Sequence, residues 1–214
     1  LPISIPALRE LSESRQRHLL RYWLRQLNLP VPHARQLQQI LHDVLTAAVD
    51  RNPCVRWPGA EIRRYRALLY ALPPLEPHDA QRTLIWRTDA EGGWPLLELP
   101  GVGWLRMQKA MGVGLCAEAL ANGSLTVGFR QGGERFRPVG RRHSQELKKL
   151  LQQADIPPWE RERLPLIYQE GIKPHQPLLA VVGLGIAADF AAMPGESGWQ
   201  PVLQSLSVAR SGIL

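Results

Sequence analysis

Apolar positions recur at helical intervals in the first fifty residues of the chain. Within residues 14–28, one apolar stripe has the spacing of a single helix face, and it consists of Leu19, Leu20, Trp23, Leu24 and Leu27. Asn28 and Pro30 end this helix. A second helix is predicted over residues 33–49, with these positions inward: Leu37, Ile40, Leu41, Val44, Leu45 and Ala48. The short link between the two helices predicts that they lie antiparallel.

After residue 50 the apolar period changes from helical to strand-like. The stretch "CVRWPGAEIRRYRALLYAL" predicts two strands around Pro58-Gly59, which is typical of a hairpin. The proline-rich stretch "PPLEPHD" at 73–79 follows and predicts a domain boundary. We therefore expect a helical domain with a β-hairpin over residues 1–75 and a second domain over residues 76–214.

The second half alternates strand and helix patterns. "WPLLELPGVGWLRM" predicts two strands joined at Pro100-Gly101, and further strands are predicted over 124–130, 164–168, 178–182 and 199–204. "SQELKKLLQQA" predicts a helix with Ser144 as N-cap and an inward face of Leu147, Leu150, Leu151 and Ala154. The predicted fold class is α+β: a helical N-terminal subdomain with a hairpin, then a mixed αβ C-terminal domain.

The charge of the chain is unevenly distributed. Its net charge is +7, and 44% of its residues are hydrophobic, which is enough for a core. Residues 1–75 carry 11 basic and 5 acidic groups, and residues 129–173 carry 10 and 6, whereas residues 76–128 carry 4 and 6. Two basic regions on either side of an acidic one suit an anionic partner, with nucleic acid the leading candidate. Plain solubility is the alternative.

Several classes of protein find no support in the sequence. Cys54 and Cys116 form no CxxC, so neither a disulfide framework nor a zinc site is predicted, and a reducing cytoplasm is expected. No apolar stretch approaches 18 residues, so we expect no membrane span. The first residues lack the features of a signal peptide. They also lack Met, so we interpret the chain as part of a longer protein.

The sequence holds no convincing catalytic constellation. None of the six histidines lies at HExxH spacing, and neither GxSxG nor GxxxxGK[ST] occurs. Gly183-x-Gly185-x-x-Ala188 matches a dinucleotide-binding fingerprint, but only 26 residues follow it, too few for the required βαβ units. A tight turn between strands is the better interpretation. We predict no catalytic residue and no metal ligand.

The window 129–149 concentrates positive charge, with seven basic and two acidic groups. We expect a turn at Gly132-Gly133 to bring Arg130 near Arg135 and Arg137, and a second turn at Pro138 and Gly140. Arg141 and Arg142 then lead into a helix N-terminus, where backbone N–H groups favour phosphate. A solvated helix face is the alternative. Trp159 either stacks on a terminal base or pins the helix to the sheet, and packing is favoured.

The string "RQGGERFRPVGRRHSQELKKLLQQADIPPWERERLPLIY", followed by "LLAVVGLGIAADF" and a late "GW", resembles the C-terminal portion of bacterial tRNA(Ile)-lysidine synthetase. "CVRWPGAEIRRYRALLYAL" after two helices resembles the middle domain of that family. The resemblance covers most of residues 8–200. It implies an ATP-dependent ligase that attaches lysine to C2 of the wobble cytidine in the CAU-anticodon isoleucine tRNA.

In that family ATP, lysine and Mg are bound by an N-terminal catalytic domain that carries an SGGxDS loop. The loop does not occur in this sequence, so we expect no cofactor in the chain and no activity from it alone. The resemblance implies a tRNA-binding role for Arg63 and Arg64 in the middle domain. For the acceptor stem it implies Arg135, Arg137, Arg141, Arg142, Lys148, Lys149 and Arg161. The alternative is a structural module that docks on the absent catalytic domain, or forms a homodimer, without binding RNA.

Overall fold

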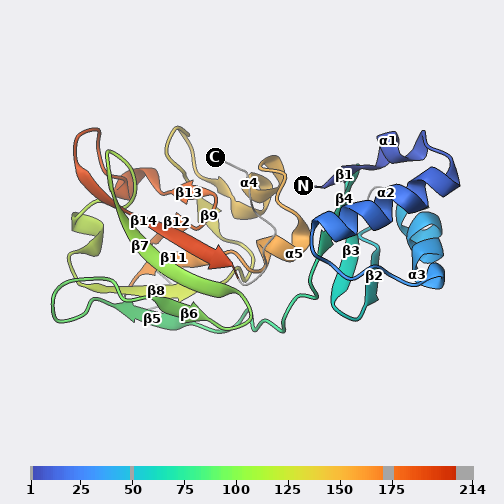
Figure 1. The fold of residues 1–214 in the computed structure, drawn as a ribbon. Helices are drawn as coiled ribbons and strands as arrows, with labels where there is room; N and C mark the ends of the chain where they lie inside the picture. Colours follow the sequence, from blue (N-terminus) through green and yellow to red (C-terminus); the bar gives the residue numbers. More distant parts are fainter. Residues whose placement is uncertain (1, 49–50, 171–175, 206–214) are drawn as a thin grey trace. The chain divides into compact units, whose positions relative to one another are not determined.

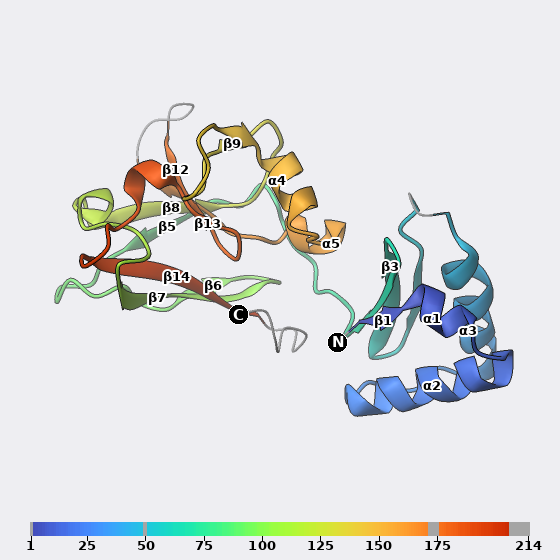
Figure 2. The ribbon, with the colours of Figure 1, turned by 90° about the horizontal axis from the view of Figure 1, so that it is seen from above.

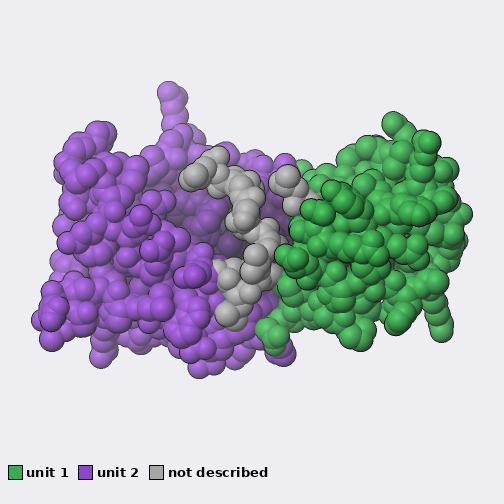
Figure 3. All heavy atoms as spheres, in the orientation of Figure 1, with its two compact units in different colours: residues 1–76, 207–214 green, residues 77–206 purple. Residues whose placement is uncertain are grey.

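The computed structural model describes residues 2–48, 51–170 and 176–205, and it divides into two compact units (Figures 1 and 3). Of the described residues, those up to 76 form unit 1 and those from 77 on form unit 2. The division after residue 76 lies one residue from the domain boundary that the prolines predict. Each unit contains its own buried apolar clusters.

Unit 1 begins with a helical part. Its elements are β1 (Ile3–Ser4), α1 (Ile5–Arg9), α2 (Glu13–Gln26), α3 (Ala34–Gln39) and a π-helical turn (Ile40–Val44) that continues α3. Both predicted helices are therefore confirmed, but the second is divided into two segments and ends before Ala48, which is exposed and not inward as predicted. Leu20, Trp23 and Leu24 of α2 are buried, as the stripe predicts. Asn28 takes a left-handed conformation with φ of 55° and ends the helical segment.

A four-stranded antiparallel sheet completes unit 1. Its order is β1-β4-β3-β2, with β2 at Cys54–Trp57, β3 at Ala60–Tyr65 and β4 at Leu68–Leu72. The prediction of only two strands was wrong, because a second tight turn lies at Arg66 and Ala67 between the paired residues Tyr65 and Leu68. Arg66 has a φ of 54°, which no glycine signals in the sequence. Helices and sheet share one core that includes Leu8, Leu20, Leu37, Ile62 and Leu69.

Unit 2 is built on two antiparallel sheets (Figure 2). The first has the order β13-β12-β11-β8-β5, with β5 Leu84–Arg87, β8 Ser124–Gly128, β11 Leu166–Gln169, β12 Leu178–Val181 and β13 Gly185–Ile186. The second has the order β14-β7-β6, with β6 Leu97–Leu99, β7 Gly103–Met111 and β14 Ser197–Ser205. Two 3₁₀ turns lie at Glu118–Leu120 and Ala188–Phe190. Both sheets contribute to one buried cluster, as Trp86, Leu105 and Leu125 illustrate.

Two glycine-dependent turns of unit 2 confirm the sequence predictions. Gly101 joins β6 to β7 with a φ of 75°, and a β-carbon there would lie 2.1 Å from the Pro77 carbonyl oxygen, so glycine is required. Gly183 lies in the turn between the antiparallel strands β12 and β13. The apparent dinucleotide fingerprint is thus a hairpin turn and not the start of a βαβ unit.

The remaining elements of unit 2 form its basic segment: β9 (Arg135–Phe136), β10 (Gln145–Glu146), α4 (Leu147–Gln153) and α5 (Pro158–Arg161). The predicted helix begins two residues later than expected, and Ser144 is not its N-cap. The reason is tertiary pairing, since Gln145 and Glu146 form a short antiparallel pair with β9. Leu147, Leu150 and Leu151 are buried as predicted, whereas Ala154 is exposed.

Candidate nucleic-acid interface

A short β-ladder fixes both ends of the loop that carries Arg141 and Arg142. β9 pairs with β10 on either side of it, and the Leu147 N–H donates to the Glu134 carbonyl oxygen at 2.8 Å. Within the loop the Arg141 N–H donates to the Pro138 carbonyl oxygen at 3.1 Å, and Gly140 has a φ of 84°. These values describe a type II β-turn, in which glycine is favoured at the third position. The two predicted arginines therefore follow a fixed turn.

Five cations of this segment are exposed, and we call them the loop–α4 surface: Arg135, Arg141, Arg142, Lys148 and Lys149. The Arg135 guanidinium donates to the Ser144 carbonyl oxygen at 2.9 Å, and that of Arg141 donates to Gln153 Oε1, also at 2.9 Å.

The contact with Gln153 draws Arg141 toward α4. Gln153 lies four residues after Lys149, and residues four apart share one face of a helix. The Arg141 guanidinium is therefore held beside the face that carries Lys149. No sequence motif indicates a role for Gln153. Its amide oxygen orients Arg141 without adding negative charge.

Two further arginines of the window are engaged with carboxylates. Arg137 is half-buried and forms an ion pair with Asp189. Arg130 Nε lies 3.8 Å from Glu134 Oε2, and the other carboxylate oxygen of Glu134 accepts the Gly132 N–H at 2.8 Å. The carboxylate of Asp189 compensates the charge of Arg137, so Arg137 attracts an anionic ligand less strongly than the five exposed cations do.

The turn after α4 is a packing element. Trp159 is only 7% exposed, which agrees with the packing interpretation. Arg161 is 8% exposed, and its Nε donates to the Ile156 carbonyl oxygen at 2.6 Å. Arg161 thus stabilises its own turn from inside, and its burial removes it from the set of exposed phosphate-binding candidates.

The two arginines predicted for unit 1 are also internal. Arg64 is 5% exposed, and its Nη1 donates to the carbonyl oxygens of Val44, Leu45 and Ala47 at 3.3, 3.1 and 2.5 Å. It caps the C-terminal end of the helical segment, where unpaired carbonyls favour a cation. Burial lowers the pKa of Arg64, and nearby Arg9 acts in the same direction. An RNA contact by Arg64 does not fit this environment.

Arg63 belongs to a buried carboxylate network. Glu61 is completely buried, and its two oxygens accept from Arg63 Nε at 2.6 Å and from Arg56 Nε at 2.7 Å. The Arg63 side chain is itself only 16% exposed. The hairpin arginines therefore satisfy internal acceptors, in contrast to the loop–α4 surface.

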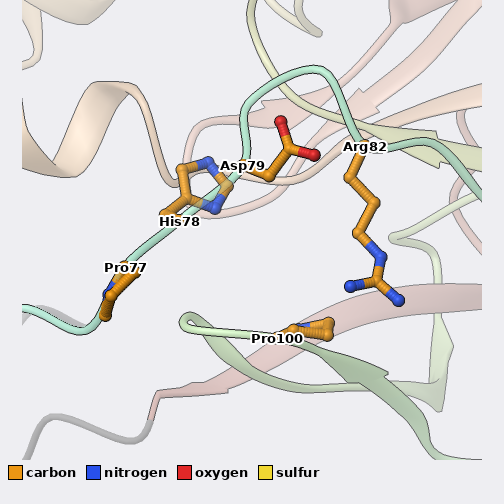
Figure 4. Close-up of a pocket in the computed structure, with 5 residues that line it drawn as sticks. All are labelled: Pro77, His78, Asp79, Arg82 and Pro100. Atoms are coloured by element: carbon orange, nitrogen blue, oxygen red, sulfur yellow. The ribbon is translucent and has the colours of Figure 1, made fainter.

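A shallow hollow of about 300 Å³ lies at the start of unit 2, lined by Pro77, His78, Asp79, Arg82 and Pro100 (Figure 4). The His78 ring packs edge-on against Phe129, and its Nε2 lies 2.9 Å from the Glu162 carbonyl oxygen. Burial lowers the pKa of His78. A neutral imidazole with these contacts fastens the first residues of unit 2 to its body.

Neither a metal cluster nor a membrane helix occurs in the described part of the chain. Over residues 2–48, 51–170 and 176–205, no group of three or more His, Cys, Asp or Glu residues is arranged to hold a metal ion. No helix in these ranges combines the length and apolar character that crossing a bilayer requires. Cys54 is exposed and Cys116 is half-buried, and both thiols are free.

Both units match domains of one enzyme family. Residues 3–70 match the TilS substrate binding domain, and residues 125–204 match the TilS substrate C-terminal domain. The tRNA(Ile)-lysidine synthase of Coxiella burnetii is 40% identical over 203 residues, which cover 94% of this chain and 43% of that protein. The synthase of Methylococcus capsulatus is 36% identical over 189 residues, covering 87% and 40%.

A solved structure described as the crystal structure of the TILS C-terminal domain covers 60% of this chain and 100% of that one, at 21% identity and a TM-score of 0.42. The chain spans about two fifths of the length of the curated relatives it matches. Two matching domains in their family order, together with relatives aligned over nearly the whole chain, establish its membership. The chain belongs to the tRNA(Ile)-lysidine synthase family and corresponds to the C-terminal part of that enzyme.

Proposed function

We propose that this chain is the tRNA-recognition part of a tRNA(Ile)-lysidine synthase, and that its loop–α4 surface binds the acceptor stem of the CAU-anticodon isoleucine tRNA. The observation that carries the proposal is that the five exposed cations have no carboxylate partner in the described part of the chain. Among the described residues, no carboxylate forms an ion pair with Arg135, Arg141, Arg142, Lys148 or Lys149. Their full charge remains available to an anionic ligand.

The chemistry of this surface suits a double-stranded RNA stem. An A-form helix hides its base edges in a deep, narrow groove, so proteins bind it by shape, phosphates and 2′-hydroxyls. Guanidinium groups donate to phosphate in a bidentate manner. The partners of Arg135 and Arg141 are a carbonyl and an amide oxygen, which orient the two groups and leave their charge uncompensated.

The chemical step belongs, in this proposal, to the part of the enzyme outside this chain. ATP, lysine and Mg bind to an N-terminal catalytic domain, which adenylates the wobble cytidine before lysine displaces AMP. This chain holds the body of the tRNA in the cytoplasm while that domain modifies the anticodon. By itself the chain has no ligase activity.

Gel-shift titration of the chain with an isoleucine tRNA transcript, at several salt concentrations, tests the proposal. We expect affinity to fall steeply with salt, because phosphate contacts release counterions. Arg141→Gln with Arg142→Gln should weaken binding by about tenfold, since two phosphate contacts are lost. The control replaces Arg82 and Arg106, which are also exposed but lie outside the surface.

Two outcomes would count against the proposal. Binding that does not depend on salt would exclude a phosphate-based contact. Normal tRNA affinity of the Arg141→Gln, Arg142→Gln variant, together with a changed elution volume in size-exclusion chromatography, would instead indicate a docking or dimerisation surface.

A further inference from the structure

The solvent face of α2 in unit 1 carries three arginines, a histidine and an exposed tyrosine. Arg15, His18, Tyr22 and Arg25 are exposed, and Arg21 is partly exposed. Their spacing of three and four residues places them on one side of the helix. We call these five residues the α2 stripe. In Figures 1 and 2, α2 is the long blue helix of unit 1, next to the shorter and darker α1.

The stripe contains no acidic residue. The one carboxylate of α2, Glu13, forms an ion pair with Arg17, which lies outside the stripe and also bonds to Gln38. In the described ranges, no hydrogen bond or ion pair occupies the guanidinium groups of Arg15, Arg21 and Arg25. The first and last of them lie ten residues apart, which is about 15 Å along a helix axis.

The central residue of the stripe is an exposed aromatic side chain. Tyr22 is 61% exposed, whereas Trp23 next to it is buried in the core. Arg25 lies three residues after Tyr22 and His18 four residues before it, so both share the face of the helix that carries the ring, while Arg21 lies at the edge of that face. An aromatic ring beside arginines is the arrangement with which proteins stack an unpaired base while binding its phosphates. Solubility alone needs neither a single sign of charge nor an exposed ring.

We infer that the α2 stripe is a second RNA-binding surface, which contacts the sugar–phosphate backbone through Arg15, Arg21 and Arg25 and stacks an unpaired nucleotide on Tyr22. The inference rests on the proposed function, because it takes the same RNA as the ligand. It also moves the RNA contact of unit 1 away from Arg63 and Arg64, whose donors are bound internally.

A matched pair of double variants tests the phosphate contacts in the 214-residue chain. Arg21→Gln with Arg25→Gln should weaken tRNA binding by about tenfold and lower the slope of log K against log salt by roughly 1.4 to 1.8, since each lost contact contributes about 0.7 to 0.9. The control, Arg35→Gln with Arg51→Gln, removes the same charge from exposed positions of unit 1 outside the stripe. Its affinity should stay within about twofold of the unsubstituted chain.

The stacking contact is tested separately at Tyr22. Tyr22→Ala should weaken binding by about tenfold, whereas Tyr22→Phe keeps the ring and should bind normally. Circular dichroism verifies that each variant folds, which is expected because the ring lies outside the core.

The outcomes distinguish this inference from the proposed function. If Arg141→Gln with Arg142→Gln weakens binding while the α2 variants bind normally, the α2 inference is wrong and the proposed function stands. If Arg35→Gln with Arg51→Gln weakens binding as much as the α2 pair, the effect is general attraction and the inference is also wrong. If the unsubstituted chain binds no tRNA, both fail.

Discussion

The arginines of the β2–β3 hairpin and those of the loop–α4 surface differ in what their guanidinium groups touch. Arg63 donates to the buried carboxylate of Glu61, and Arg64 donates to three carbonyl oxygens at the C-terminal end of the helical segment. Arg135 and Arg141 are exposed and donate to neutral oxygens. A cluster of arginines in the sequence therefore does not by itself indicate a ligand-binding site. Burial and the charge of the hydrogen-bond partners distinguish arginines that stabilise the fold from arginines that can bind a ligand.

The largest effect is expected at Arg64, because a buried arginine with internal partners should contribute to the stability of the fold. Arg64→Gln leaves several carbonyl oxygens without a donor and removes a cation from a helix C-terminus. We expect the free energy of unfolding to fall by about 3 kcal/mol. Urea denaturation measures this change. If Arg64→Gln kept its stability but lost tRNA affinity, the assignment of Arg64 to a structural role would be wrong.

A somewhat smaller effect is expected at Glu61. Glu61→Gln removes the shared counter-charge of Arg56 and Arg63, and we expect a loss of about 2 kcal/mol because Arg63 lies mostly in the protein. Arg56→Gln is the control, and its effect should be below about 1 kcal/mol, since that side chain is 66% exposed. If Glu61→Gln and Arg56→Gln lowered the free energy of unfolding equally in urea denaturation, burial of the ion pair would not explain its contribution to stability.

The orientation of Arg141 offers a sharper test of the comparison. Gln153→Glu replaces its neutral partner by a carboxylate and should reduce tRNA affinity by about fivefold, because an ion pair and added negative charge oppose phosphate. Gln153→Ala removes only the orienting contact and should reduce affinity by about twofold. Gel shifts at constant salt compare the two. A tighter complex with Gln153→Glu would refute the idea that a neutral partner matters.

The smallest expected effect concerns His78, an internal contact of unit 2. Burial lowers the pKa of His78 in the folded chain, so the unfolded chain takes up a proton first as the pH falls. Stability from this group is complete above its ordinary pKa of about 6.5 and declines below it. Because the ring keeps some contact with solvent, we expect a loss of less than about 0.5 kcal/mol near pH 5.5.

His78→Gln keeps a donor for the Glu162 carbonyl oxygen and does not titrate, so it is the matched control. Urea denaturation of both chains between pH 7.5 and 5.5 measures the difference. An identical pH dependence in the two chains would exclude His78 as its source.

Arg63 and Arg64 were predicted to bind RNA, and part of this error could have been avoided from the sequence. Glu61 and Arg63 lie two positions apart in a predicted strand, so they share a face, and their pairing could have been expected. The carbonyl partners of Arg64 come from 17 to 20 residues earlier in the chain. No local pattern indicates that contact. Likewise, nothing near Ser144 announces that the next two residues pair with β9 and delay the start of α4.

The sequence by itself determined the α2 and α3 helices, the turns at Gly59, Gly101 and Gly183, the proline-rich boundary and the concentration of positive charge over 129–149. These features depend on local periodicity, on backbone conformations open to glycine and on composition, which are all properties of neighbouring residues. Only the tertiary structure decided which arginines meet solvent and which cap helices or bind Glu61. An arginine side chain is long, and its free energy depends on distant acceptors and on burial, which folding alone brings together.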